Sequence, residues 1–176
     1  MEMEKSFSIS ALLHPPTYID KIVLGSEEGG LRLWHVGENR MIHDFDAAQV
    51  GTSRITCMAN APALDIIAVG HTSGVITVFH LKAGKRLLQF RQDGPVTALS
   101  FRTEVAGVPM LASADDLGDI TLWDLQAKRL IHVLHHAHDA AITSLHFLLK
   151  QPLLMSTGAD NTIKVFTLRH LVLYQS

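Results

Sequence analysis

The stretch Gly118-Asp119-Ile120-Thr121-Leu122-Trp123-Asp124-Leu125 places a turn residue, a short apolar strand and an aromatic residue in succession. The same layout, with the turn residue five positions before the aromatic residue, recurs in three other stretches: Gly29 to Trp34, Gly74 to Phe79 and Asn161 to Phe166. The aromatic residues lie at positions 34, 79, 123 and 166, at intervals of 45, 44 and 43 residues. The chain therefore repeats one structural unit four times.

Each unit is predicted to contain a hairpin turn followed by a strand that is apolar on both faces. Glycine has no Cβ and asparagine tolerates the left-handed region, so both residue types suit the positive φ of a tight turn. Side chains alternate along a strand, so Ile120 and Leu122 project to one face while Trp123 projects to the other. Sheets covered on both faces, a period of about 40 to 45 residues and the Trp123-Asp124 pair are typical of WD-type β-propeller blades.

We therefore expect an all-β protein with about four four-stranded antiparallel blades of the WD40 type, which together form an incomplete propeller. The blades are predicted at residues 9–46, 54–91, 96–134 and 138–176. β-Branched residues are enriched in these segments, and Asp93-Gly94-Pro95 marks a turn before the third blade. Residues 1–8 are polar and are expected to be disordered.

Composition and charge restrict the class of protein. Of the 176 residues, 47% are hydrophobic and 18% are charged, and the net charge of −2 gives no basic field for coating nucleic acid. The single cysteine, Cys57, cannot form an intramolecular disulfide, which favours a reducing compartment and a buried structural role. No apolar run approaches the roughly 20 residues that span a bilayer, and the N-terminus does not look like a signal sequence. We expect a soluble intracellular protein without membrane contact.

A cluster of histidines could be mistaken for a zinc site. Five histidines lie close together in the sequence: His132, His135, His136, His138 and His146. No cysteine lies near them and no helical His-Glu-x-x-His motif accompanies them, so their spacing matches no recurring metal site. An enzyme that uses this histidine-rich segment is the less favoured alternative. We expect no metal, no cofactor and no small-molecule substrate.

His138, Ser156 and Asp160 could also be interpreted as a catalytic triad, but a structural role is favoured. In WD blades a loop histidine, a second-strand serine or threonine, a hairpin aspartate and the third-strand tryptophan form a buried hydrogen-bonded chain, which offers no substrate cleft. Phe166 replaces the tryptophan of this set and has no N–H to donate. The other blades have different residues at the aspartate position: Glu28, Ser73 and Leu117. We therefore expect blades one to three to be held mainly by packing, and no catalytic residue in the chain.

Several loop motifs resemble one family of tandem-propeller proteins more closely than WD repeats in general. They are His14-Pro15-Pro16-Thr17-Tyr18, Lys21-Ile22-Val23-Leu24-Gly25-Ser26, Pro62-Ala63-Leu64-Asp65-Ile66-Ile67-Ala68-Val69-Gly70, Asp93-Gly94-Pro95-Val96-Thr97 with Ser100-Phe101-Arg102-Thr103, and Gln151-Pro152-Leu153-Leu154 with Gly158-Ala159-Asp160-Asn161. Over roughly residues 9–168 the chain resembles the N-terminal propeller portion of the WD-repeat subunit of the UTP-B complex of the small-subunit processome.

This resemblance implies a noncatalytic scaffold of the nucleus and nucleolus. Members of the family hold neighbouring UTP-B proteins in the particle that processes pre-ribosomal RNA toward the small-subunit RNA, and any RNA contact is made at a rim or indirectly within that assembly. The family has two propellers and a C-terminal helical part, whereas this chain shows about four blades of the first propeller. The alternative function is that of a general WD-repeat adaptor, for example in a ubiquitin ligase or a signalling assembly.

The blade count predicts exposed end faces. Four strands about 4.8 Å apart and five residues of about 3.3 Å each cover roughly 300 Å², so an open arc would expose about 600 Å² on its two end faces. That area is at the upper limit for a soluble monomer. We expect either a piece of a longer chain or an arc that associates with a second copy or a partner, with closure of four blades on themselves as the alternative.

Overall fold

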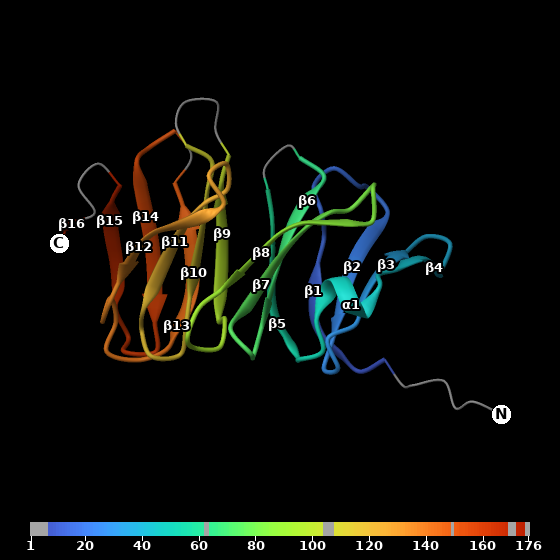
Figure 1. The fold of residues 1–176 in the computed structure, drawn as a ribbon, viewed down its shortest axis with the longest axis horizontal. Coiled ribbons are helices and arrows are strands. Elements are labelled where there is room, and N and C mark those ends of the chain that lie inside the picture. The colour runs from blue at the N-terminus through green and yellow to red at the C-terminus, as the bar shows by residue number, and fades with distance from the viewer. Residues whose placement is uncertain (1–6, 62–63, 104–107, 149, 169–171, 175–176) are drawn as a thin grey trace.

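The computed structural model describes residues 7–61, 64–103, 108–148, 150–168 and 172–174. The described strands form four antiparallel sheets of four strands each (Figure 1). Blade 1 contains β1 (Ile9–Leu13), β2 (Lys21–Ser26), β3 (Leu31–His35) and β4 (Arg40–Asp44). Blade 2 contains β5 (Ile55–Asn60), β6 (Ile66–His71), β7 (Val75–His80) and β8 (Lys85–Arg91). Blade 3 contains β9 (Ala98–Arg102), β10 (Met110–Ala114), β11 (Ile120–Asp124) and β12 (Arg129–Leu134), and blade 4 contains β13 (Ile142–Phe147), β14 (Leu153–Gly158), β15 (Ile163–Thr167) and β16 (Val172–Tyr174).

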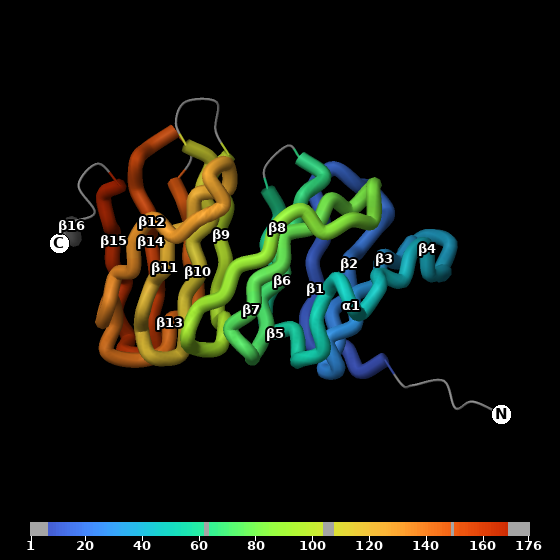
Figure 2. The backbone as a smooth tube through the Cα atoms, in the orientation of Figure 1, coloured from blue at the N-terminus to red at the C-terminus, as the bar shows by residue number. Residues whose placement is uncertain are grey.

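Within each blade, consecutive strands are hydrogen-bonded neighbours, so each sheet is a simple meander. The first strands of successive blades contact one another, β1 with β5, β5 with β9 and β9 with β13. The blades therefore stand side by side in a row, with blade 1 and blade 4 at opposite ends (Figure 2). The predicted fold class, an all-β arc of four propeller blades that does not close into a ring, is confirmed.

Three apolar clusters hold neighbouring blades together, one at each junction. The aromatic residue of each third strand packs toward the preceding blade: Phe79 lies in the cluster of blades 1 and 2, Trp123 in that of blades 2 and 3, and Phe166 in that of blades 3 and 4. Burial of each such side chain removes a large apolar area from water, which makes blade stacking the main source of stability.

The two end blades each present an uncovered face. Leu31, Ile76 and Ile120 occupy one repeat position and face the next blade, and each is 0% exposed. Ile163 occupies the same position in blade 4, which is the last blade among the described residues, and it is 70% exposed. At the other end Trp34, which has no preceding blade to pack against, is only half-buried.

Two segments outside the strands differ from a plain connector. The connector after blade 1 contains a short helix, α1 (Ala47–Val50), which the sequence pattern did not predict; the Asp46 carboxylate caps it by accepting a hydrogen bond from the Ala48 N–H at 3.0 Å. Of the N-terminal segment expected to be disordered, residues 1–6 lie outside the described residues. Phe7 and Ser8 contact blade 1, since the Arg32 guanidinium lies 4.3 Å above the Phe7 ring and the Ser8 carbonyl accepts from the Glu27 N–H at 2.8 Å.

Cys57 lies at the junction of blades 2 and 3, with its Sγ 3.8 Å from the Val96 carbonyl oxygen. Burial raises the pKa of its thiol to about 12, against a small lowering by the Thr56 hydroxyl, so the thiol is protonated and unreactive at neutral pH. Within the described part of the chain, no helix has both the length and the apolar composition that a membrane crossing needs.

Candidate functional site

The predicted turn residues lie in the hairpins that precede the third strands. The φ angles of Gly29, Gly74, Gly118 and Asn161 are +85°, +76°, +91° and +62°, respectively. At Gly118 a Cβ atom would lie 2.0 Å from the His138 carbonyl oxygen. The missing side chain at this turn therefore allows blade 3 to approach the loop that leads into blade 4.

Blade 4 contains the hydrogen-bonded chain expected for a WD blade. The Ser156 hydroxyl lies 2.7 Å from His138 Nε2, and His138 Nδ1 lies 3.0 Å from both carboxylate oxygens of Asp160. Asp160 also accepts from the Asp139 N–H at 3.1 Å and from the Thr162 hydroxyl at 2.7 Å. These hydrogen bonds join the loop before β13 to the hairpin before β15, so they hold this end of the blade together.

Burial and electrostatics give this chain a structural character. Partial burial raises the pKa of the Asp160 carboxyl, but hydrogen bonds from Thr162, His138 and Asp139 outweigh that effect and hold the pKa well below its usual range. His138 and Ser156 are 0% and 1% exposed. A serine hydroxyl that solvent does not reach offers no position for a substrate carbonyl beside it.

Blade 3 contains an equivalent chain built from different residues. The Trp123 indole N–H donates to the Ser113 hydroxyl oxygen at 2.9 Å, and the Ser113 hydroxyl donates to Gln92 Oε1 at 2.6 Å. Gln92 Nε2 donates to the Gly94 and Ala114 carbonyl oxygens at 3.2 Å each. The backbone N–H groups of Gln92 and His138 occupy equivalent positions. Each donates a 3.0 Å hydrogen bond to the carbonyl oxygen of the glycine in the preceding hairpin. The expectation that blades one to three are held mainly by packing did not include this buried polar chain of blade 3.

Blades 1 and 2 have apolar residues at the corresponding positions. By strand register, Leu24 and Val69 occupy the positions of Ser113 and Ser156. In blade 2 the Phe79 ring instead packs edge-on against Phe45, with the ring centroids 5.6 Å apart. Packing holds these two blades, as predicted.

The residue directly after the third-strand aromatic residue closes the turn that follows, a role that was not predicted from the sequence. The Asp124 carboxylate accepts from the Gln126 and Ala127 N–H groups at 2.9 and 2.7 Å, which closes the turn between β11 and β12. His35 and His80 occupy the same position in blades 1 and 2, and their Nδ1 atoms accept from the Glu38 and Ala83 N–H groups at 3.2 and 3.4 Å. A histidine directly after the aromatic residue was the available signal, because its ring nitrogen replaces the aspartate oxygen.

The other histidines of the suspected zinc cluster do not converge. His135 Nδ1 lies 2.7 Å from Asp119 Oδ2, and the His136 backbone N–H donates to Asp119 Oδ1 at 2.8 Å. Among the residues with described positions, no group of three or more histidine, cysteine or carboxylate side chains is arranged to hold a metal ion. These side chains fasten the loop before blade 4 to blade 3.

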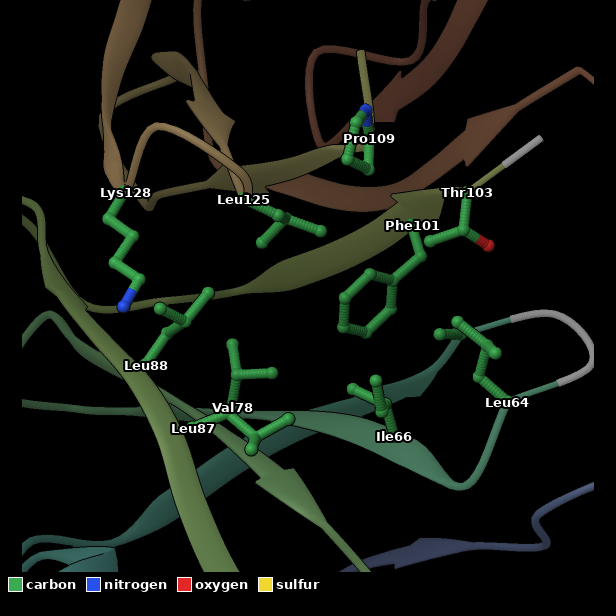
Figure 3. Close-up of a pocket in the computed structure, with 11 residues that line it drawn as sticks. Leu64, Ile66, Val78, Leu87, Leu88, Phe101, Thr103, Pro109, Leu125 and Lys128 are labelled. Atoms are coloured by element: carbon green, nitrogen blue, oxygen red, sulfur yellow. The ribbon is translucent and has the colours of Figure 1, made fainter. Parts of the chain in front are cut away.

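Two kinds of exposed apolar surface stand out among the described residues. One is formed by the two end faces described above. The other is a groove of about 360 Å³ between blades 2 and 3, which we call the blade 2–3 groove (Figure 3). Its walls are formed by Ile66, Val78, Leu87 and Leu88 of blade 2 and by Phe101 and Leu125 of blade 3.

A family model described as the WDR36/Utp21 first beta-propeller matches residues 1–168. The chain belongs to this family. The resemblance predicted from the loop motifs is thereby confirmed.

Curated relatives of the family are similar along most of the chain. WD repeat-containing protein 36 of Homo sapiens is 45% identical over 161 residues, which is 91% of this chain and 17% of that protein. U3 small nucleolar RNA-associated protein 21 homolog of Schizosaccharomyces pombe is 42% identical over 156 residues, which is 89% of this chain and 17% of that protein. The chain thus spans about a sixth of the length of the curated relatives it matches.

Solved structures show the same fold at lower sequence identity. The chain superimposes on the structure of U3-55K with a TM-score of 0.81 and 21% identity, covering 98% of this chain and 52% of that chain. It superimposes on the computationally designed Ika4 protein with a TM-score of 0.74 and 23% identity, covering 95% of this chain and 99% of that chain. A chain of nearly this length therefore occurs elsewhere as a folded molecule with this arrangement of strands.

Proposed function

We propose that this chain is a noncatalytic protein-interaction scaffold in ribosome biogenesis, which helps to assemble the small-subunit processome for processing of pre-ribosomal RNA. Its partners are other UTP-B proteins, and any contact with pre-rRNA is made at a rim or through those proteins. The place of action is the nucleolus. No cofactor takes part.

The observation that carries this proposal is the similarity of nearly the whole chain to relatives named for their association with U3 small nucleolar RNA. The site geometry is consistent with it. His138 and Ser156, which could be interpreted from the sequence as members of a catalytic triad, are buried as parts of a satisfied network. Exposed apolar surface between and beyond the blades provides area for protein contacts.

Affinity purification from nucleolar extract tests the proposal. The tagged chain is expected to recover UTP-B proteins together with U3 small nucleolar RNA and pre-rRNA, and a fluorescent fusion is expected to concentrate in nucleoli. The tagged Ika4 protein is a matched control, because it has the same fold and nearly the same length. Proteins that both baits recover bind to propeller surfaces in general and are subtracted.

Two outcomes would overturn the proposal. Recovery of neither processome proteins nor U3 RNA above the Ika4 control would remove the role in ribosome biogenesis. A partner set dominated by ubiquitin-ligase or signalling proteins would instead favour the general adaptor function.

The exposed end faces support a second part of the proposal, which is pairing of the chain with a second copy. Inside the arc, the face that carries Ile76 or Ile120 is covered by the aromatic-bearing face of the next blade. Ile163 lacks such a cover, and Trp34 of a second copy belongs to the matching kind of face. Head-to-tail pairing at both ends would bury about 1,200 Å² in total, using roughly 300 Å² per face, which is the lower end for a specific interface.

Light scattering of the purified chain tests this pairing. We expect a mass of twice the 19.4 kDa of one chain, and a single-chain mass for Ile163→Asp. Leu130→Asp is the control, because Leu130 is 49% exposed on the outer strand β12 rather than on an end face. A monomer that resists protease would contradict the proposed pairing.

A further inference from the structure

We propose that the blade 2–3 groove is a docking site for a linear peptide segment of a partner protein, in which apolar side chains enter the groove and an adjacent aspartate or glutamate pairs with Lys128. The inference deepens the scaffold function by naming the kind of partner. Its basis is the lining and charge of the groove, compared with the same position at another blade junction.

The groove is apolar along its length and open to solvent. Its floor is formed by buried side chains, since Val78 is 2% exposed and Phe101 is 6% exposed. Leu64 and Leu87 lie at its rim and are each 44% exposed. A volume of about 360 Å³ is within the range of ligand sites, and water-exposed leucines around it gain free energy when a partner covers them.

The junction of blades 1 and 2 shows what this position contains when it is not apolar. A pocket of about 270 Å³ there is lined in large part by the repeat equivalents of the groove residues, one repeat earlier in the chain. Three of its residues differ in kind from their groove equivalents: Lys21 and His43 are polar where Ile66 and Leu88 are apolar, and Gly84 has no side chain where Lys128 carries a charge. The Tyr18 ring also fills part of this wedge, with Lys21 Nζ 4.6 Å from its centroid. The fold therefore tolerates a polar lining at this position, and the apolar lining at blades 2 and 3 is not required for blade packing.

Charge selects an acidic occupant. Lys128 stands at one end of the groove in Figure 3, and no acidic side chain of the described residues pairs with it. Lys128 is the charged residue among the side chains that line the groove, and neither β8 nor β12 carries an acidic residue. A single cation at the end of an apolar groove complements a carboxylate that lies next to apolar side chains.

The backbone at Lys128 is the second unusual feature of this end of the groove. Its φ is +58°, whereas the same turn position is occupied by Asn39 at +48° in blade 1 and by Gly84 at +60° in blade 2. Glycine and asparagine are the residue types that this region of φ favours. Lysine is less suited to the turn than either, so replacing it with glycine removes the charge without straining the fold.

The lining favours a peptide over a nucleic acid. Single-stranded RNA is held by aromatic rings on which its bases stack, together with basic residues that contact the phosphates. Phe101 is the aromatic residue of the groove lining, and its ring is buried beneath the rim rather than presented to solvent. Aliphatic walls with one cation match apolar peptide anchors followed by a carboxylate.

Selection from a displayed library of random twelve-residue peptides against the purified chain tests this inference. We expect the enriched sequences to contain two or more large apolar residues next to aspartate or glutamate. For an enriched peptide, Lys128→Gly should weaken binding about tenfold without lowering the melting temperature. Leu88→His combined with Lys128→Gly, which copies the lining at blades 1 and 2, should weaken it by about a hundredfold. Leu130→Glu, at a leucine of similar exposure outside the groove, should leave binding unchanged.

Three results would overturn the inference. They are enriched peptides without an acidic residue, enriched peptides that bind the groove variants as tightly as the unmodified chain, and no enrichment above that seen with the Leu88→His/Lys128→Gly variant. A fluorescent uridine 20-mer serves as the nucleic-acid probe, and loss of its binding in the groove variants would assign the groove to RNA instead. None of these assays contains processome components, so the docking site and the role in ribosome biogenesis can fail separately.

Discussion

Blades 3 and 4 differ from blades 1 and 2 in the side chains that are buried beneath the loops leading into their first strands. Each of the later two blades buries a hydrogen-bonded chain, Gln92–Ser113–Trp123 in one and His138–Ser156–Asp160 in the other. The earlier two have Leu24 and Val69 at the serine position and are held by apolar contacts. All four nevertheless form the same four-stranded meander.

The difference shows that the buried polar chain is not what makes a blade. Hairpin geometry and two apolar faces are common to all four units, and these suffice for stacking. A polar chain can be added where each of its members finds a partner, and its residues can change from histidine to glutamine if the hydrogen bonds are kept. Mutations should therefore be costly for different reasons in the two halves.

The largest expected effect is the loss of a third-strand aromatic residue, and it should be similar in both halves. Phe79→Ala and Trp123→Ala each remove a large buried ring and should lower the free energy of unfolding by roughly 3 to 5 kcal/mol. Urea unfolding followed by circular dichroism measures both. A loss below about 1 kcal/mol for either variant would mean that its ring is not in a blade core.

A somewhat smaller loss is expected at a hairpin turn, where backbone geometry rather than packing decides. Gly118→Ala should cost roughly 3 kcal/mol, because alanine is strained at φ +91° and its Cβ would lie 2.0 Å from the His138 carbonyl oxygen. Gly37→Ala is the control, since the added Cβ would meet only the His35 ring at 3.6 Å. Equal effects of the two substitutions would show that the approach of blade 3 to blade 4 is not constrained at this turn.

The polar chain of blade 3 provides the next prediction. Gln92→Leu should cost about 1 to 3 kcal/mol, because the Ser113 hydroxyl and three carbonyl groups lose their partner in a buried or partly buried site. Combined with Trp123→Phe, it should show a coupling energy of at least about 0.5 kcal/mol. Gln89→Leu, on the exposed side of β8, is the control and should change stability by less than about 0.5 kcal/mol. Strict additivity of Gln92→Leu and Trp123→Phe would contradict the equivalence of the polar chains in blades 3 and 4.

The fold was predictable because its signals repeat. A single turn glycine or a single tryptophan specifies little, but four turn residues each five positions before an aromatic residue indicate the same hairpin four times. The repeat also indicated that the aromatic rings would be buried between sheets, and Phe79, Trp123 and Phe166 are. Helix α1 escaped prediction because its four residues are too few to show a helical period.

The parts of the site that were missed depend on contacts between segments far apart in the sequence. Gln92 lies 21 residues from Ser113, and a glutamine at that position has no meaning until strand register brings the two together. The blade 2–3 groove likewise depends on which leucines of β8 and of the loop after β11 meet across two sheets. His138 was recognised only because histidine is the usual residue at that position in a WD repeat.

The smallest expected effect concerns two buried histidines, one in each half. His138 lies beside the Asp160 carboxylate, whereas His71 in blade 2 is 0% exposed and its Nδ1–H donates to the neutral Ser53 carbonyl oxygen at 2.9 Å. Burial disfavours the charged imidazole and lowers the pKa of His71, although its backbone hydrogen bonds oppose this shift. Its pKa in the folded chain is therefore below that in the unfolded chain.

The sign of the resulting pH dependence follows from that order. Above the ordinary histidine pKa of about 6.5, His71 is neutral in both states and contributes no pH dependence. As the pH falls below this value the unfolded chain binds a proton first, so the free energy of unfolding decreases until the pH reaches the folded-state pKa. His71→Asn keeps a donor near the Ser53 carbonyl and does not titrate, so it should flatten the decrease measured by urea unfolding between about pH 7 and pH 5. An unchanged slope in this variant would show that the acid sensitivity arises from groups other than His71.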